Sequence, residues 1–106
     1  MNTYEDRLRK GVDFTVVNAA ARTNLLPILQ RWLPDGRVHG REFVARNPKR
    51  EDRRPGSFSI NLRSGKWADF ASNDRGGDPV SLAAYLFDLS QMEAARRLAD
   101  MLGVQR

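Results

Sequence analysis

Apolar residues recur at helical spacing in the first part of the chain, between residues 12 and 33. This spacing is typical of helices that place one face against a core. The apolar positions are Val16, Val17, Ala20, Leu25, Leu26, Ile28, Leu29 and Trp32. A proline inside a helix removes a backbone donor and crowds the preceding turn, so Pro27 divides the pattern. We expect one helix capped by Asp13 and ending at about Thr23. A second helix begins at about Asn24 and carries Pro27 in its first turn.

The middle of the chain alternates polar and apolar residues, and this period of two predicts strands. The clearest run spans residues 57–63, and its apolar members face one side of a sheet, toward the core: Phe58, Ile60 and Leu62. Shorter runs at 42–45 and 66–71 predict two more strands, and the tight turn indicated by Ser64-Gly65 joins the last two. We therefore expect a three-stranded antiparallel sheet, with a polar loop over 47–56 between its first two strands.

Capping signals predict two further helices in the last third of the chain. Asp78 is a good N-cap, and Pro79 suits the first helical position. Ser90 and Glu93 have the spacing of a capping box, in which a hydroxyl and a carboxylate each satisfy a backbone amide at the helix start. Gly103 is placed to end the last helix. The apolar stripe of that helix comprises Ala94, Ala95, Leu98, Met101 and Leu102.

The length of 106 residues predicts a single domain over 1–106, with residues 1–12 as a flexible start. The order of the elements predicts an α+β fold, in which helices before and after the three-stranded sheet cover one of its faces. Seven aromatic residues are available for the core: Trp32, Phe43, Phe58, Trp67, Phe70, Tyr85 and Phe87. The sequence contains no apolar run long enough to cross a membrane, and its first ten residues mix acids and bases, so we expect a cytoplasmic protein without membrane contact.

The net charge of +5 is concentrated in one part of the chain. Residues 37–66 hold nine basic side chains and only three acidic ones, and the rest of the chain is nearly neutral. A concentration of positive charge favours a polyanionic partner such as a nucleic acid. The alternative is that these are charged loops that only contact water, and charge alone does not decide between the two.

The residue types argue against catalysis and against a conventional zinc site. The chain has no cysteine and a single histidine, His39, which we expect at the surface. Structural zinc needs thiolate and imidazole ligands, and a nucleophilic serine usually needs a histidine base. Gly76-Gly77 before a helix could cradle a phosphate, but the pair lacks the Gly-Lys-Ser/Thr of a Walker loop, and we favour a permissive turn. We expect no catalytic residue, no metal and no cofactor.

Several short segments occur in a recognisable order. They are Gly40-Arg41-Glu42-Phe43-Val44-Ala45, Asn47-Pro48, Pro55-Gly56-Ser57-Phe58-Ser59-Ile60, and Gly76-Gly77-Asp78 at the start of a helix. This order resembles the N-terminal zinc-binding domain of bacterial DNA primases over about residues 24–104. The resemblance implies a zinc-ribbon-like sheet with flanking helices.

The metal ligands of that family are replaced in this sequence. Where the family has Cys-Pro-x-His, this chain has Asn47-Pro48-Lys49-Arg50, and the second cysteine pair falls near Asp69 and Ser72 or Asn73. The chain therefore resembles the zinc-free variant in primase and primase-helicase proteins of phages and mobile elements. In such domains bound metal can supply on the order of 10 kcal/mol of folding free energy, so other contacts must close these loops. Arg50 at a ligand position is expected to make the binding face more basic.

The resemblance implies a module that binds single-stranded template DNA, or RNA, for a catalytic primase or helicase domain in cis or in trans. The side chains expected to contact nucleic acid are Arg41, Arg46, Lys49, Arg50, Arg53, Arg54, Arg63, Lys66, Trp67 and Arg75. Cationic side chains would meet phosphates, and Trp67 would stack on a base unless it lies in the core. The alternative function is a protein-interaction or regulatory module that kept the scaffold and docks its basic loop on an acidic surface.

Overall fold

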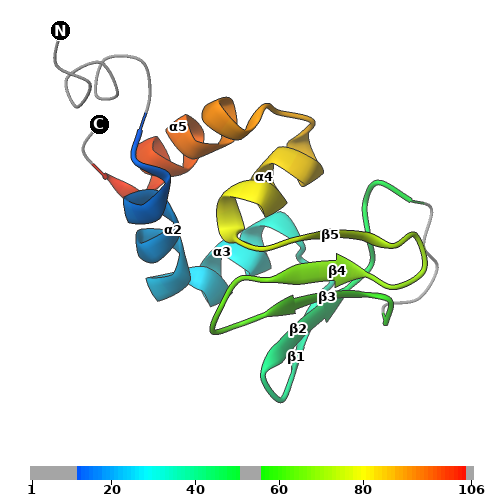
Figure 1. The fold of residues 1–106 in the computed structure, drawn as a ribbon. Coiled ribbons are helices and arrows are strands. Elements are labelled where there is room, and N and C mark those ends of the chain that lie inside the picture. The colour runs from blue at the N-terminus through cyan, green and yellow to red at the C-terminus, as the bar shows by residue number, and fades with distance from the viewer. Residues whose placement is uncertain (1–11, 51–55, 105–106) are drawn as a thin grey trace, which may run out of the picture.

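The computed structural model describes residues 12–50 and 56–104, which form four helices and one five-stranded antiparallel sheet (Figure 1). The helices are α2 (Phe14–Thr23), α3 (Leu25–Trp32), α4 (Pro79–Phe87) and α5 (Gln91–Leu102). The strands are β1 (Arg37–His39), β2 (Glu42–Ala45), β3 (Phe58–Asn61), β4 (Trp67–Asp69) and β5 (Asp74–Gly76), and they are neighbours in the order of the chain. The predicted α+β class is correct. The predicted flexible start lies, apart from Val12, outside the described residues.

The expectation of three strands is wrong because the sheet has an additional strand at each edge. β1 pairs with β2, and β5 pairs with β4, both antiparallel. Each of these edge strands has only three residues, too few to show a period of two, and Gly76 suggests a turn rather than a strand. Their pairing is decided by the neighbouring strand and not by their own sequence. The three central strands lie where they were predicted. β2 has the predicted bounds, whereas β3 and β4 are shorter than predicted at both ends.

The predicted caps of the helices are confirmed, except that the capping box expected at Ser90 and Glu93 has only its hydroxyl half. The Asp13 carboxylate accepts a hydrogen bond from the Thr15 amide at 2.9 Å, and α2 ends at Thr23. Asp78 caps α4 and forms a reciprocal capping box with Ser81. At α5 the Ser90 hydroxyl accepts from the Glu93 amide at 3.1 Å, whereas the Glu93 carboxylate accepts from the Arg97 side chain. Gly103 ends α5 in the left-handed conformation that glycine adopts readily.

The core has two parts that meet at α4. In the first, α3 and α4 lie on the inner face of the sheet, where Phe43, Phe58, Ile60 and Trp67 pack against Leu25, Leu29, Leu33 and Leu82. In the second, α2, α4 and α5 pack on one another through small residues such as Ala94, Ala95 and Ala99. Figure 1 shows the helices gathered at one side of the molecule and the sheet at the other. Among the described residues, none of the helices has the length and apolar character needed to span a bilayer.

Two of the seven aromatic residues expected in the core are exposed. Phe70 is 77% exposed and Phe87 is 49% exposed. Phe70 follows β4 with the parity of Ala68, which faces away from the helices, so period two carries its ring to the outer face. Phe87 is the last residue of α4 and contacts Trp32 edge to face, with ring centroids 5.5 Å apart. Both exposed rings therefore lie where the core packing ends.

Candidate nucleic-acid interface

The outer face of the sheet carries a row of small side chains between two arginines. The register aligns Arg37 with Val44, Val44 with Ser59, Ser59 with Ala68, and Ala68 with Arg75. No described helix packs on this row, because the helices occupy the opposite face through the alternate residues of the same strands. Adjacent strands lie roughly 4.8 Å apart, so the five strands separate the two edge arginines by ~19 Å. The result is a row of small side chains with a cation at each edge.

The loops at the end of a second row of side chains add positive charge beside the first row. Cross-strand pairing places His39 beside Glu42, and Glu42 beside Asn61. The Lys66 carbonyl accepts the Asn61 amide at 2.7 Å, and the Arg41 carbonyl accepts the Leu62 amide at 2.8 Å. The side chains of Arg41, Arg63 and Lys66 are exposed at this end of the sheet.

An exposed aromatic ring completes the outer face. Phe70 lies two residues after Ala68, and its amide donates to the Ser57 carbonyl at 2.8 Å, which fixes the backbone beside β3. The Phe70 ring lines a shallow hollow on this face together with Glu42, Ser59, Asn61, Lys66 and Ala68. An exposed ring beside cations is the combination that single-strand binding surfaces use for base stacking and phosphate contact.

Trp67 does not have this role, because it lies in the core with 5% of its surface exposed. Its ring packs against Tyr85 with centroids 4.6 Å apart, and its indole N–H donates to Ser81 Oγ at 3.0 Å. The sequence left open whether Trp67 stacks on a base or lies in the core, and in the structure it lies in the core. Phe70 is the aromatic that the sequence reasoning assigned to the core instead.

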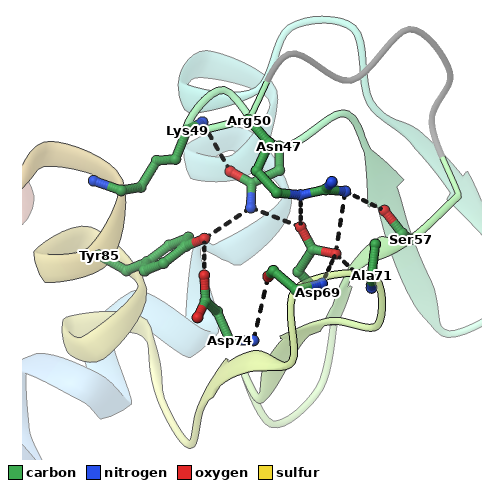
Figure 2. Close-up of polar contacts among 9 residues, drawn as sticks. Asn47, Lys49, Arg50, Ser57, Asp69, Ala71, Asp74 and Tyr85 are labelled. Atoms are coloured by element: carbon green, nitrogen blue, oxygen red, sulfur yellow. Dashed lines mark hydrogen bonds and ion pairs between the residues drawn. The ribbon is translucent and has the colours of Figure 1, made fainter.

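On the other side of the sheet, the residues at the replaced ligand positions form a polar cluster (Figure 2). Asn47 Nδ2 donates to Asp69 Oδ2 and to the Tyr85 hydroxyl, each at 2.8 Å. Arg50 Nε donates to Asp69 Oδ2 at 2.8 Å, and Arg50 Nη2 donates to Ser57 Oγ at 3.1 Å. Asn47 and Asp69 are completely buried. The cluster therefore joins the loop after β2 to the end of β4 and to α4.

The pKa of Asp69 shows that the cluster favours the ionised form of this carboxyl group. Burial by itself would raise the pKa of this carboxyl group. Hydrogen bonds from Asn47, Arg50 and the amides of Ala71 and Ser72 outweigh burial and hold the pKa far below its usual range. Burial raises the pKa of the Tyr85 hydroxyl, and its hydrogen bond to Asp74 at 2.7 Å adds to this rise. At neutral pH the cluster thus contains an ionised aspartate and a neutral tyrosine.

Three of the predicted phosphate contacts have acidic partners within the domain. Arg50 pairs with Asp69, Lys49 pairs with Asp88 of the α4 end, and Arg46 lies 3.5 Å from Asp35. The expectation that Arg50 makes the binding face more basic is wrong, because Asp69 neutralises its charge inside the cluster. The Arg46 and Asp35 side chains are both exposed, so this pair is weak and a phosphate can compete for Arg46. The Lys49 side chain is only 27% exposed and lies over the Tyr85 ring, so it is less accessible to a phosphate.

The remaining predicted contacts divide into three groups. Arg41, Arg63 and Lys66 lie together at one end of the sheet, and Arg75 lies on β5 at its edge, where its guanidinium donates to Asn73 Oδ1 at 3.1 Å. Arg53 and Arg54 fall outside the described residues. Sequence reasoning missed Arg37, Glu42 and Phe70 as members of this face. The alternation of side chains along β2 and β4 would have placed Glu42 and Phe70 on the outer face of the sheet. Arg37 could not be placed there from the sequence, because it belongs to β1, which was not predicted.

Gly76, the first glycine of the pair before α4, has a packing role at the end of β5. A Cβ atom on Gly76 would overlap the Trp67 indole and Ser81 Oγ, so the absent side chain allows the ring to pack under the strand. Gly77 has open space around its Cα hydrogens. Within residues 12–50 and 56–104 no group of three or more histidine, cysteine, aspartate or glutamate side chains is placed to hold a metal ion.

Comparison with protein-family models, with curated proteins and with solved structures gave no match to this chain.

Proposed function

We propose that this domain binds single-stranded DNA across the outer face of its sheet, as the template-binding module of a primase or primase-helicase. One observation carries the proposal: the row from Arg37 to Arg75, in which three small residues separate two cationic edges. Small residues let a strand of nucleic acid approach the sheet closely, and arginines at the edges neutralise its phosphates.

The size and character of this face favour a single strand over a duplex. A row of ~19 Å across the sheet suits about four nucleotides, the lower end of the range for small sheet platforms. The exposed Phe70 ring is accessible to a base that is not already paired and stacked. Direct readout of a duplex usually inserts a helix or a two-stranded ribbon into the major groove, whereas this face is five strands wide.

The polar cluster supports the resemblance to the primase domain. Asn47, Arg50 and Asp69 occupy positions that resemble metal ligands in that family, and they lie within hydrogen-bonding distance of one another. A buried charged and hydrogen-bonded cluster can close the same loops that a metal would close. In this proposal the domain itself catalyses nothing, and a primase or helicase domain in cis or in trans carries the chemistry.

The proposal is tested by the salt dependence of oligonucleotide binding. If five phosphates are neutralised, the affinity for a single strand should fall with salt at a log–log slope of about −3.5. Replacing Arg41, Arg63 and Arg75 by alanine removes three contacts and should bring the slope to about −1.4. The matched control replaces three cations on the helical side, Arg22, Arg31 and Arg97, and should leave the slope unchanged. Equal binding by both triple variants would overturn the proposed interface.

DNA and RNA strands of the same sequence should be compared in the same assay, because phosphate contacts do not distinguish them.

A protein-interaction module is the second candidate function, and one observation favours it. On the helical side Trp32, Phe87, Leu89 and Met101 line an apolar hollow, and Phe87 and Met101 are partly exposed. Absence of oligonucleotide binding at low salt would favour that candidate.

A further inference from the structure

Phe70 is the most exposed aromatic ring in the part of the chain that the structure describes, at 77% exposure. Alternate residues along a strand point to one face, so Lys66, Ala68 and Phe70 lie on the outer face of the sheet. The ring lines a hollow of about 260 Å³, and the small residues Ser59 and Ala68 line it as well. Phe70 belongs to neither of the two core clusters. Its ring therefore faces solvent beside a surface of small side chains and is not needed for core packing.

The turn that carries Phe70 is fixed by hydrogen bonds on both sides of the ring. The Phe70 amide donates to the Ser57 carbonyl at 2.8 Å. The next two amides, of Ala71 and Ser72, donate to Asp69 Oδ1 at 2.9 and 3.4 Å. Three consecutive amides are thus bonded in a turn whose side chains are exposed. The backbone of the ring is held in place although nothing covers its side chain.

Asp69 connects this turn to the buried polar cluster. Its side chain is completely buried, and its Oδ2 atom accepts from Asn47 Nδ2 and from Arg50 Nε, each at 2.8 Å. Figure 2 shows the carboxylate joined to both of these side chains and to the backbone at Ala71. An aromatic ring that is held in place before binding loses less conformational freedom when a ligand stacks on it, and binding is stronger for that reason.

We infer that Phe70 is the stacking platform for one unpaired nucleobase of the bound strand, and that Asp69 positions this ring through the turn that it holds. The inference rests on the proposed function and deepens it, because it assigns recognition of a base, as distinct from a phosphate, to one ring and its buried support. Every base has an aromatic face, so the platform does not require a particular base. Lys66 lines the same hollow and is exposed, which places a cation beside the stacked nucleotide.

The first experiment compares two eight-residue strands that have the same phosphodiester backbone. One is oligo-thymidine, and the other consists of abasic tetrahydrofuran residues, which keep the phosphates and lack the bases. At constant low salt we expect oligo-thymidine to bind at least about fivefold more tightly, since stacking is the contact that the abasic strand lacks. Equal affinities would overturn the inference.

Substitutions at Phe70 test whether this ring is the platform. Phe70→Ala should reduce the preference for oligo-thymidine to about twofold or less and leave the salt slope unchanged, because no cation is altered. Phe70→Trp keeps an aromatic face and should keep the preference. Its emission should be quenched more by oligo-thymidine than by the abasic strand, relative to the parent. The control Phe87→Ala removes an exposed ring on the helical side and should keep the preference. A full preference in Phe70→Ala would refute the assignment of the ring.

The variant Asp69→Asn tests the positioning role. Asparagine has one acceptor oxygen where aspartate has two, so it cannot satisfy both the cluster donors and the amides of the turn. The preference for oligo-thymidine should fall at least about twofold, whereas the salt slope should stay that of the parent. The control Tyr85→Phe also removes hydrogen bonds from the cluster but leaves the bonds of Asp69 intact, so it should keep the preference. An unchanged preference in folded Asp69→Asn would refute the positioning role.

Hydrogen exchange in the parent measures the same turn without any substitution. The amides of Ala71 and Ser72 should exchange at least about tenfold more slowly than in an unstructured peptide, because both are bonded to Asp69. Unprotected exchange at both positions would contradict the positioning role even if Asp69→Asn does not fold.

The outcomes distinguish failure of this inference from failure of the proposed function. If neither strand binds at low salt, the proposed function fails together with the inference. If both strands bind equally and with the expected salt slope, only the stacking platform is refuted. Phe70 lies outside the core, so its variants should melt at the temperature of the parent, and circular dichroism checks that each is folded.

Discussion

The Nε atom of Arg50 donates to Oδ2 of Asp69 at 2.8 Å, and this bond connects two segments 19 positions apart in the sequence. The Asp69 side chain is completely buried, whereas 34% of the Arg50 side chain is exposed. A carboxylate that leaves water at this position needs several donors, and Arg50, Asn47 and two backbone amides provide them. The pair therefore holds the loop after β2 against the end of β4.

Replacing Asp69 by alanine should destabilise the domain by about 3 kcal/mol, the low end of the range for breaking a buried ion pair. The low end applies because Arg50 is partly exposed and can recover some hydration. Asn47 and two amides would lose an acceptor at the same time. Urea unfolding measures the change. The control is Arg97→Ala, which breaks the exposed Arg97–Glu93 pair and should cost less than about 0.5 kcal/mol. Similar values for the two variants would contradict a stabilising role for the cluster.

Acid should weaken the domain through the same carboxylate. The pKa of Asp69 is lowered in the folded state, so its contribution to stability is complete above the unfolded value near 4 and is lost as the pH falls toward the folded pKa. The free energy of unfolding should therefore decline steadily below about pH 4.5. Carboxyl chemical shifts provide the direct measurement, and Asp69 should remain ionised at pH 3 in the folded protein. Titration of Asp69 near pH 4 would show that the cluster does not hold it.

At the alkaline end, Tyr85 should limit stability. Its pKa is raised by burial and by Asp74, so the folded state keeps the neutral hydroxyl while the unfolded chain ionises near pH 10. Stability should fall as the pH rises above about 10. The variant Tyr85→Phe should lose this dependence, at a cost at neutral pH of about 1 kcal/mol for the missing hydrogen bonds to Asn47 and Asp74. Identical alkaline profiles for parent and variant would refute the assignment.

The two adjacent glycines before α4 should respond very differently to alanine. At Gly76 the new methyl group would overlap the Trp67 indole, whose position is fixed by Ser81 and Tyr85, so we expect a loss of about 1–3 kcal/mol. At Gly77 the methyl group meets open space, and the change should be within about 0.5 kcal/mol. Thermal unfolding of the two variants gives the comparison. Equal effects would show that Trp67 does not pack beneath β5.

The stability of the parent should not depend on metal, whereas a designed variant should bind zinc. Chelator treatment should leave the melting temperature of the parent unchanged. The quadruple variant Asn47→Cys, Arg50→His, Asp69→Cys and Ser72→Cys places zinc ligands at the positions of the cluster, and it should bind one zinc ion per chain. Metal analysis and the melting temperature with and without chelator measure this. Failure of the folded variant to bind zinc would contradict the proposed equivalence of the cluster to a metal site.

The sequence by itself determined the helices and the central strands. Asp13, Pro27, Asp78 and Gly103 act on the backbone within one or two turns, so their effect can be read without knowledge of the fold. The alternation around Phe58 and Ile60 likewise identified the inner face of β3. The concentration of basic residues in the middle of the chain was also visible, because it is a property of composition.

Only the tertiary structure decided which of those basic residues face solvent and which close the fold. Arg50 and Arg63 both belong to the basic middle of the chain, yet Arg50 meets a buried aspartate from another segment and Arg63 lies exposed in the turn after β3. The edge strands β1 and β5 exist because a neighbour offers unpaired backbone groups, and this created the row from Arg37 to Arg75. The exchange of roles between Trp67 and Phe70 has the same cause. Whether a ring is buried depends on which face of the sheet its side chain points to and on which face the helices cover. Local sequence fixes neither the register nor the covered face.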